Sequence, residues 1–314
     1  MNILSPITNS ENVVIEKRIS TTWLINEYQQ VLNIDVSKYF KNLNEILVCQ
    51  CMDSGYRFYY PFSVAGDGGF YSALENFSWY YMDDKWEHNE ALKYVEKGAK
   101  VLEIGSGRGG FLNKASERAE VCVGLELNES AVTEACSRGL NTLTETVETH
   151  AQTHKKFYDI VCSFQVLEHI PNVNEFIHSS LATLKTGGLL IFCVPNNESF
   201  IIQENTLITN MPPHHMGLWT PNALLGLQKF YCVKTESLLF EPLQPYHFGY
   251  GIDFLMKKFS SLRPNFVQRA IAKLARIFSN PFPTLHQMAE LSTSAFSSFL
   301  PGHSILVVYR KVEQ

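Results

Sequence analysis

Several features that would tie this chain to a membrane, a secretory route or a nucleic acid are missing from its 314 residues. No apolar run reaches the ~18 residues that a membrane span needs. The segment Met1–Ser20 has no basic start followed by an apolar core, so we expect no secretory signal. The net charge of −5 gives no broad basic footprint for a nucleic acid. We therefore expect a cytoplasmic protein.

Cysteine is also used in a way that excludes two common scaffolds. The seven cysteines are odd in number and widely scattered, so nothing demands an oxidising compartment. The closest pair is Cys49-x-Cys51, and no second pair follows at the spacing of a zinc site. The composition, with 45% hydrophobic and 18% charged residues, is ordinary for a globular enzyme. No metal is expected.

The most informative part of the sequence is a glycine-rich turn between two apolar strands. The first strand and the turn read Val-Leu-Glu-Ile-Gly-Ser-Gly-Arg-Gly-Gly-Phe over Val101–Phe111, and the second strand, Val121–Glu126, ends on a carboxylate. Glycines let the backbone approach a ligand closely and adopt positive φ angles. A carboxylate at a strand tip can accept hydrogen bonds from both hydroxyls of a ribose. The pattern predicts a nucleoside pocket.

The glycines alone fit two cofactors. Gly105-x-Gly107-x-x-Gly110 matches the dinucleotide pattern literally. Glu103, however, lies two residues before the first glycine, where it would face the phosphates of a dinucleotide. A carboxylate there suits a ligand with an ammonium group and no phosphate. The stretch resembles the first motif of the class I S-adenosylmethionine-dependent methyltransferases, and the resemblance implies S-adenosylmethionine as the cofactor.

Strands and helices alternate from Val101 to Phe240, which predicts an α/β fold with a parallel sheet covered on both faces. The resemblance implies a Rossmann-like, seven-stranded, mostly parallel sheet whose last two strands form an antiparallel hairpin. The expected strands are Lys100–Ile104, Val121–Glu126, Asn141–Leu143, Tyr158–Ser163, Leu189–Val194, Cys232–Phe240 and Ser304–Tyr309. The expected helices are Gly110–Arg118, Glu129–Arg138, Val173–Leu184 and Pro221–Lys229, with Gly187-Gly188 closing a helix before the fifth strand.

Four segments are expected along the chain. They are an N-terminal helical and aromatic extension with a cofactor lid (1–85), the cofactor-binding core (86–240), a helical insertion forming a lid or substrate region (241–302), and the last core strand (303–314). In the extension, Thr21–Val31 and Val36–Leu47 are expected to be helices. The stretch Tyr56–Trp86 carries twelve aromatic residues in 31 positions, and most of them are expected to fill a core.

The resemblance also implies which residues line the cofactor pocket. A tyrosine of the aromatic stretch would close over the sulfonium or hold the methionine carboxylate, and the segment Glu145–Glu148 falls where related enzymes contact the adenine. The implied residues are Tyr81, Glu103, Gly105, Ser106, Gly107, Gly109, Glu126, Leu127, Thr146, Val147 and Gln165.

Three histidines are the candidates for acid–base chemistry. His169 ends the Phe-x-x-Leu-Glu-His segment after the fourth strand, and His214 and His215 lie in a Pro-Pro-His-His loop after the fifth. Methyl transfer to a hydroxyl needs alignment and a base, and imidazole suits that role because its unperturbed pKa is ~6.5. Structural histidines are the alternative. Metal binding is not favoured, because adjacent histidines are expected to point in different directions and no carboxylate is close in sequence.

The insertion leaves its own alternatives open. Six basic and no acidic residues lie between Lys257 and Arg276, and apolar residues recur there at helical spacing. The segment is interpreted as a helix packed on the core. The alternatives are a lid over an anionic substrate such as a nucleotide-sugar, and a helix over 257–278 that contacts anionic lipid. The oligomeric state is left open.

We interpret the chain as a methyltransferase that moves a methyl group from S-adenosylmethionine to a small molecule, with a sugar or related hydroxyl as the preferred acceptor. An NAD(P)-dependent oxidoreductase and a non-catalytic partner protein with a methyltransferase fold are the alternatives. DNA amino-methylation is disfavoured, because the fourth strand does not end in an Asn/Asp-Pro-Pro-Tyr motif. No nucleic-acid partner is expected.

Overall fold

The computed structural model describes residues 2–77, 80, 82–199, 202, 207–242, 244 and 302–313. The chain divides into two compact units. The first comprises Met1–Pro195, Leu207–Leu239 and Leu306–Gln314, and the second comprises Asn196–Thr206 and Phe240–Ile305. The candidate site lies within the first unit.

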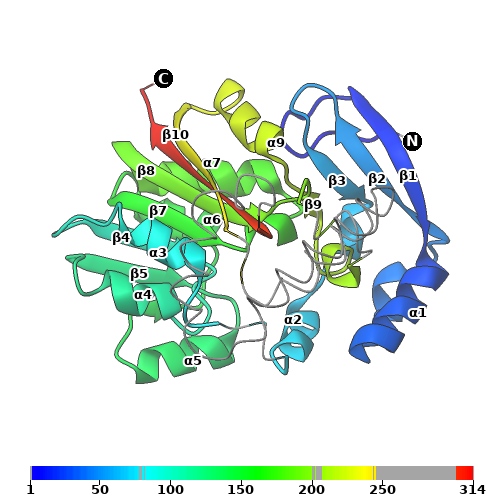
Figure 1. The fold of residues 1–314 in the computed structure, drawn as a ribbon, viewed down its shortest axis with the longest axis horizontal. Coiled ribbons are helices and arrows are strands. Elements are labelled where there is room, and N and C mark those ends of the chain that lie inside the picture. The colour runs from blue at the N-terminus through cyan, green and yellow to red at the C-terminus, as the bar shows by residue number, and fades with distance from the viewer. Residues whose placement is uncertain are drawn as a thin grey trace, which may run out of the picture. The chain divides into compact units, whose positions relative to one another are not determined.

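A seven-stranded sheet forms the centre of the fold, with the strand order β10-β11-β8-β7-β4-β5-β6 (Figure 1). The pairs β4–β5, β4–β7, β5–β6 and β7–β8 are parallel. The strands are β4 (Lys100–Ile104), β5 (Val121–Leu125), β6 (Thr142–Leu143), β7 (Tyr158–Phe164), β8 (Leu184–Pro195), β10 (Val233–Phe240) and β11 (Ser304–Lys311). The strand order reverses direction between β4 and β7, and open parallel sheets bind ligands at such a switch point. The expected seven-stranded sheet is confirmed.

The last two strands run antiparallel, as expected. Glu241 donates its backbone N–H to the carbonyl of Ser304, while Val312 donates to the carbonyl of Cys232, so the two strands pair in opposite directions. One expectation nearby is wrong. Gly187 lies inside β8 at φ 79°, where the register against β7 shifts, and it does not close a helix. Its positive φ absorbs this irregularity, which lengthens β8 at its start.

Helices lie on both faces of this sheet (Figure 1). Helix α3 contacts α4, and α6 contacts α7, which packs on β7 and β8. The start of α5 follows the expected rule, because the Asn128 side chain accepts from the backbone N–H groups of Ser130 and Ala131. The helices are α3 (Trp86–Leu92), α4 (Gly110–Ala115), α5 (Glu129–Ser137), α6 (Val147–Thr153), α7 (Val173–Thr183) and α9 (Pro221–Gly226), with 3₁₀ turns η3 (Leu167–His169), η4 (Ile208–Asn210) and η5 (Leu227–Lys229).

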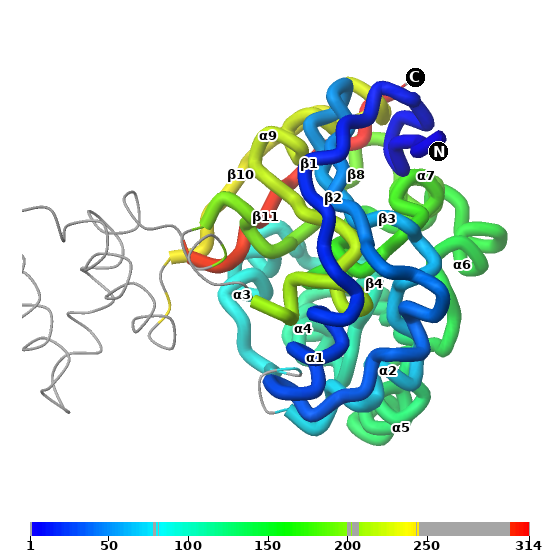
Figure 2. Tube along the Cα trace, turned by 90° about the vertical axis from the view of Figure 1, so that its right-hand side faces the viewer, coloured from blue at the N-terminus to red at the C-terminus, as the bar shows by residue number. Residues whose placement is uncertain are grey.

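The N-terminal section contains a second sheet that the sequence reading missed. Its strands β1 (Val13–Ser20), β2 (Glu45–Cys51), β3 (Arg57–Tyr60) and β9 (Gly217–Leu218) pair antiparallel in that order. Figure 2 shows β1 and β2 running side by side. The expected helix Thr21–Val31 is confirmed as α1 (Thr21–Leu32), and α2 (Gly68–Leu74) follows β3. The expected helix Val36–Leu47 is wrong, because a single turn η1 (Ser37–Phe40) leads into β2.

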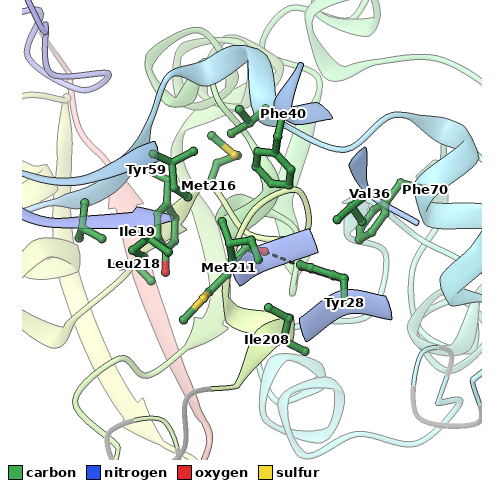
Figure 3. Close-up of a cluster of buried hydrophobic side chains, with 14 of the residues drawn as sticks. Ile19, Tyr28, Val36, Phe40, Tyr59, Phe70, Ile208, Met211, Met216 and Leu218 are labelled. Atoms are coloured by element: carbon green, nitrogen blue, oxygen red, sulfur yellow. Dashed lines mark hydrogen bonds between the residues drawn. The ribbon is translucent and has the colours of Figure 1, made fainter. Parts of the chain in front are cut away.

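A hydrophobic core joins this second sheet to the loop before β9 (Figure 3). Tyr28 of α1 and Phe70 of α2 are buried there beside Met211 and Met216, which come from the Pro-Pro-His-His loop. A hydrogen bond of 2.8 Å from the Tyr28 hydroxyl to the Met211 carbonyl fixes the loop against α1. Several aromatic residues of the Tyr56–Trp86 stretch are buried in this core, as expected: Tyr59, Phe70 and the more peripheral Phe62, Tyr71, Phe77 and Tyr80.

Most of the predicted insertion, including 245–301, lies outside the described residues. The expectations of a helix over 257–278 and of a substrate-facing segment at 245–251 therefore stay predictions. In the second unit, the Glu241 carboxylate accepts the backbone N–H of Ser304 at 3.0 Å. No helix in the described ranges combines the length and the apolar character that a membrane crossing needs.

Candidate functional site

The glycine-rich turn joins β4 to α4, and its backbone requires glycine. Gly105, Gly107 and Gly109 have φ angles of 75°, 52° and 83°. A Cβ on Gly105 would lie 2.3 Å from Cγ2 of Val166, and one on Gly109 would lie 2.3 Å from Cδ1 of Leu140. The turn is therefore closely packed against Val166 and Leu140. A side chain at Gly105 or Gly109 would both strain the backbone and displace one of these neighbours.

Glu103 lies inside β4, two residues before the first glycine of the turn, and its side chain is buried. Its side-chain oxygen Oε2 and the hydroxyl of Ser106 are both buried without a hydrogen-bond partner in the described part of the chain. Burial raises the pKa of Glu103 well above its usual range, against the opposing effect of Lys85. A buried carboxylate of this kind is satisfied by a cationic donor. The arrangement fits the ammonium group of S-adenosylmethionine and disfavours a phosphate.

Glu126 follows β5 and already accepts hydrogen bonds from the turn. Its Oε2 accepts the backbone N–H of Gly107 at 2.8 Å, and its Oε1 accepts those of Leu127 and Asn128 at 2.8 and 2.9 Å. The residue is half-buried. Two acceptor oxygens held rigidly beside a glycine turn are what the two hydroxyls of a ribose require.

The expected adenine-contacting residues lie at the start of α6. The Thr146 hydroxyl caps this helix by accepting the Thr149 backbone N–H at 3.3 Å, and the side chain of Val147 is buried. Leu127 is exposed at 65% of its surface, at the rim beside Glu126. These positions stay predictions as cofactor contacts, as does Tyr81, which lies outside the described residues.

The end of β7 places a non-glycine residue with a positive φ at the switch point. Gln165 has φ 57°, which is uncommon for a residue with a side chain, and its backbone N–H donates to the Cys193 carbonyl at 2.8 Å. The next residue, Val166, is the one packed against Gly105. Strained backbone of this kind concentrates at functional sites. The segment leading to His169 therefore adjoins the glycine turn.

His169, His214 and His215 come together in the structure. Their ring centroids are 4.8, 4.9 and 4.5 Å apart. One ring nitrogen of each lies within 4.8 Å of the others. His214 and His215 are 6% and 7% exposed, so the cluster is nearly closed to solvent. The sequence argument that adjacent histidines point in different directions does not hold for this loop.

A hydrogen bond fixes the protonation of the His214 ring. Its Nδ1 donates to the Thr209 carbonyl at 2.7 Å, and because a carbonyl only accepts, Nδ1 carries the proton and Nε2 keeps its lone pair. The His169 ring contacts two backbone groups, with Nδ1 2.7 Å from the His214 carbonyl and a further hydrogen bond to the backbone of Gln165. Burial lowers the pKa of His169 to about 4 and that of His214 well below its usual range. Both imidazoles are neutral at physiological pH.

The sequence reading missed Glu168 as a site residue. Its side chain is 1% exposed, and Oε1 lies 3.8 Å from Nε2 of His169. Burial raises the pKa of Glu168 to about 8. The one signal in the sequence was its position beside His169 at the end of a buried strand, where a carboxylate is costly unless it has a role.

The N-terminal sheet places the histidine loop. The backbone N–H of Met216 donates to the Glu168 carbonyl at 2.7 Å, and the Met216 carbonyl accepts from Tyr59 at 2.9 Å. The Tyr71 ring packs edge-on against His169, with 5.4 Å between centroids. The loop is thus held between the end of β7 and the second sheet.

The expected lid segment before α3 also contacts the glycine-turn helix. Asp84 forms an ion pair with Lys114 of α4, and Asp83 lies 3.8 Å from Arg138 at the end of α5. A Cβ on Gly110 would lie 2.9 Å from the Asp83 carbonyl oxygen. The segment therefore closes on the first turn of α4, and its role as a lid stays a prediction.

Comparison with known proteins places this site in a family. Residues 79–230 match the family model described as a methyltransferase domain. A ubiquinone biosynthesis O-methyltransferase from Shewanella sp. (strain ANA-3) is 32% identical over 176 residues, covering 48% of this chain and 74% of that protein. One from Hydrogenovibrio crunogenus is 36% identical over 103 residues, covering 31% of this chain and 42% of that protein.

Among solved structures, a SAM dependent methyltransferase from Archaeoglobus fulgidus is 15% identical, with a TM-score of 0.49 over 78% of this chain and all of that chain. The sequence relatives decide between the two cofactor classes that the glycines left open, since they are methyltransferases and not dehydrogenases. With 32% identity over 74% of the Shewanella protein, this chain belongs to the class I S-adenosylmethionine-dependent methyltransferases.

Proposed function

We propose that this methyltransferase acts on a hydroxyl oxygen of a small molecule, a sugar or related alcohol, and that the hydroxyl lies against the histidine cluster His169–His214–His215. The observation that carries the proposal is the convergence of these three imidazoles at the end of β7, next to the segment packed on Gly105. The relatives are named as O-methyltransferases, which favours oxygen over nitrogen or carbon as the acceptor atom.

The cofactor half of the site follows from residues of the glycine turn. S-adenosylmethionine, when bound, supplies a methyl group on a positively charged sulfur, which is an excellent leaving group. Glu103 would hold the ammonium group, because its buried carboxylate has an oxygen unpartnered among the described residues. Glu126 would hold the ribose hydroxyls, and the glycines at 105, 107 and 109 admit the ligand close to the backbone.

The acceptor half needs alignment and a site for the hydroxyl proton. Nε2 of His214 keeps a lone pair, since its Nδ1 donates to the Thr209 carbonyl. This nitrogen can accept the proton of a hydroxyl that approaches the cluster, which leaves the oxygen more nucleophilic. Because burial has removed most water around the rings, the hydrogen bond to the hydroxyl also orients it.

The proposal is tested by incubating the enzyme with isotope-labelled cofactor and a panel of sugars, nucleotide-sugars and phenols, followed by mass spectrometry. We expect one class of hydroxyl compound to gain a labelled methyl group on oxygen. His214→Gln should reduce turnover by ~10²-fold or more, in the range of general-base loss. His178→Gln, at an exposed histidine outside the cluster, is the matched control. Label on nitrogen or carbon, or cofactor binding without any product, would contradict the proposal.

A further inference from the structure

The histidine cluster has the composition and spacing of a metal centre. It brings together three imidazoles from two segments of chain, and one nitrogen from each lies within 4.8 Å of the other two. A zinc–nitrogen bond is about 2.0–2.1 Å, so two nitrogens on one tetrahedral ion lie roughly 3.3 Å apart. The widest pair would close by roughly 1.5 Å on metal binding, through movement of the His169 and His215 rings.

In each of the three rings, Nδ1 has a hydrogen-bond partner. Nδ1 of His169 and of His214 lie 2.7 Å from carbonyl oxygens, and Nδ1 of His215 lies 2.9 Å from Oδ1 of Asn210. Metal-bound histidines almost always hold their other ring nitrogen in this way, because the contact fixes the tautomer and the ring orientation. All three members of the cluster have such a partner.

One nitrogen of the cluster carries a free-energy cost because it is buried without a hydrogen-bond partner in the described part of the chain. Nε2 of His214 is buried with no hydrogen-bond partner among the residues that the structure describes. A buried polar atom left unpaired costs ~1–3 kcal/mol. The ring is held in place by Phe70 and Tyr71, whose centroids are 5.9 and 6.2 Å away, so it does not turn outward to water. A fixed, neutral imidazole nitrogen without a hydrogen-bond partner is available to bind a metal ion.

We propose that His169, His214 and His215 bind one divalent transition-metal ion of the zinc type through their Nε2 atoms. Three imidazoles suit zinc and its neighbours and do not suit magnesium or calcium, which require oxygen ligands. Three protein ligands also leave a fourth position open, which is the pattern of catalytic rather than structural zinc.

The inference rests on the proposed function in one respect only, the acceptor hydroxyl that would occupy the fourth position. There the acceptor hydroxyl would coordinate the ion and its O–H bond would break, with the proton passing to water. With the ion bound, the imidazoles act as ligands, so the ion takes the place of the imidazole base in the proposed function. The positive charge of the ion would lower the pKa of the coordinated hydroxyl. Metal binding itself does not depend on any methyl transfer.

The experiment measures metal binding directly on the full-length enzyme. Protein stripped with a chelator is titrated with Zn²⁺ by calorimetry and with Co²⁺ by visible absorption, and bound metal is counted after dialysis. We expect about one ion per chain and a Co²⁺ spectrum typical of tetrahedral nitrogen coordination. His214→Gln and His215→Gln should each weaken binding by at least ~10–100-fold, the loss caused by disturbing even the outer partners of a metal site.

The control variants separate this site from adventitious binding. His178→Gln removes an exposed histidine and should leave stoichiometry and affinity unchanged. Asn210→Ala removes the partner of His215 without removing a ligand, so a smaller loss is expected even if a ligand variant folds poorly. No specific Zn²⁺ binding by the wild-type enzyme, or equal binding by the wild type and the cluster variants, would overturn the inference. S-adenosylhomocysteine binding, measured in parallel, would stay intact in that case, which distinguishes this failure from failure of the proposed function.

Discussion

Replacing Glu126 by glutamine separates its role in the cofactor site from its role in the turn. The carboxylate accepts three backbone N–H groups, from Gly107, Leu127 and Asn128, at 2.8–2.9 Å. Glutamine keeps one acceptor oxygen, which can still serve Leu127 and Asn128, but turns an N–H donor toward Gly107. We expect the free energy of unfolding to fall by about 1.5–3 kcal/mol, the contribution of one hydrogen bond to a charged group.

Cofactor binding is expected to weaken by a similar free energy. A hydrogen bond to a charged acceptor contributes about 1.5–3 kcal/mol and one to a neutral acceptor about 0.5–1.5 kcal/mol, a difference of roughly 1 kcal/mol for each ribose hydroxyl. Two hydroxyls give about 2 kcal/mol. At 1.4 kcal/mol for each factor of ten, the Kd for S-adenosylhomocysteine should rise about 30-fold.

Isothermal titration calorimetry on folded protein, with the thermal midpoint recorded alongside, is the assay. Glu129→Gln is the matched control, because this exposed carboxylate lies three residues further on, in the first turn of α5, and its loss changes the net charge equally. A variant at Glu126 that unfolds earlier but binds as tightly as the wild type would refute the ribose contact. Equal weakening in both variants would mean that only the overall charge matters.

Three further outcomes follow from the site. Gly105→Ala should abolish cofactor binding by calorimetry, because the new Cβ would lie 2.3 Å from Val166 at φ 75°; binding within tenfold of wild type would contradict the packing. Burial raises the pKa of Glu103, so the folded state holds its proton to higher pH than the unfolded state. The free energy of unfolding of the ligand-free enzyme should therefore fall as pH rises above the ordinary glutamate pKa of ~4.3, and Glu103→Gln should flatten that slope in denaturant titrations. Tyr28→Phe removes the 2.8 Å bond to Met211, so we expect a loss of about 1 kcal/mol in the free energy of unfolding and a slower turnover with unchanged cofactor affinity, whereas unchanged turnover would mean that the bond does not position the loop.

The cofactor half of the molecule could be predicted from the sequence because its signals are local. The strand Lys100–Ile104 matches the structure residue for residue, and the helix predicted at Glu129–Arg138 is observed as Glu129–Ser137. Each short apolar strand is followed by a turn or cap residue, such as Asn128, that marks the next element. The glycines of the turn were also predictable, because the strand before them and the helix after them lie within a few residues.

The N-terminal sheet could not be predicted in the same way, because its evidence is not local. Residues Ile46–Cys49 form a short apolar run, and such runs do not distinguish a strand from a helix by periodicity. The last strand of the sheet, β9, has two residues and pairs Phe58 with Gly217, far along the chain. A pairing of this kind exists only once the two segments have folded together.

The convergence of His214 and His215 on His169 could not be predicted for the same physical reason. Side chains of consecutive residues diverge in regular strands, but His214 and His215 lie in a turn where both backbone N–H groups bond to the Met211 carbonyl, at 3.0 and 3.2 Å. That turn is fixed by Tyr28 and Tyr59, which belong to the N-terminal section. The glycine turn and the strands beside it belong to the segment that matches the family model, residues 79–230, whereas the loop that carries His214 and His215 is held by hydrogen bonds to residues of the N-terminal section. That section lies outside the matched segment, so the family motifs carry no information on how this loop is placed.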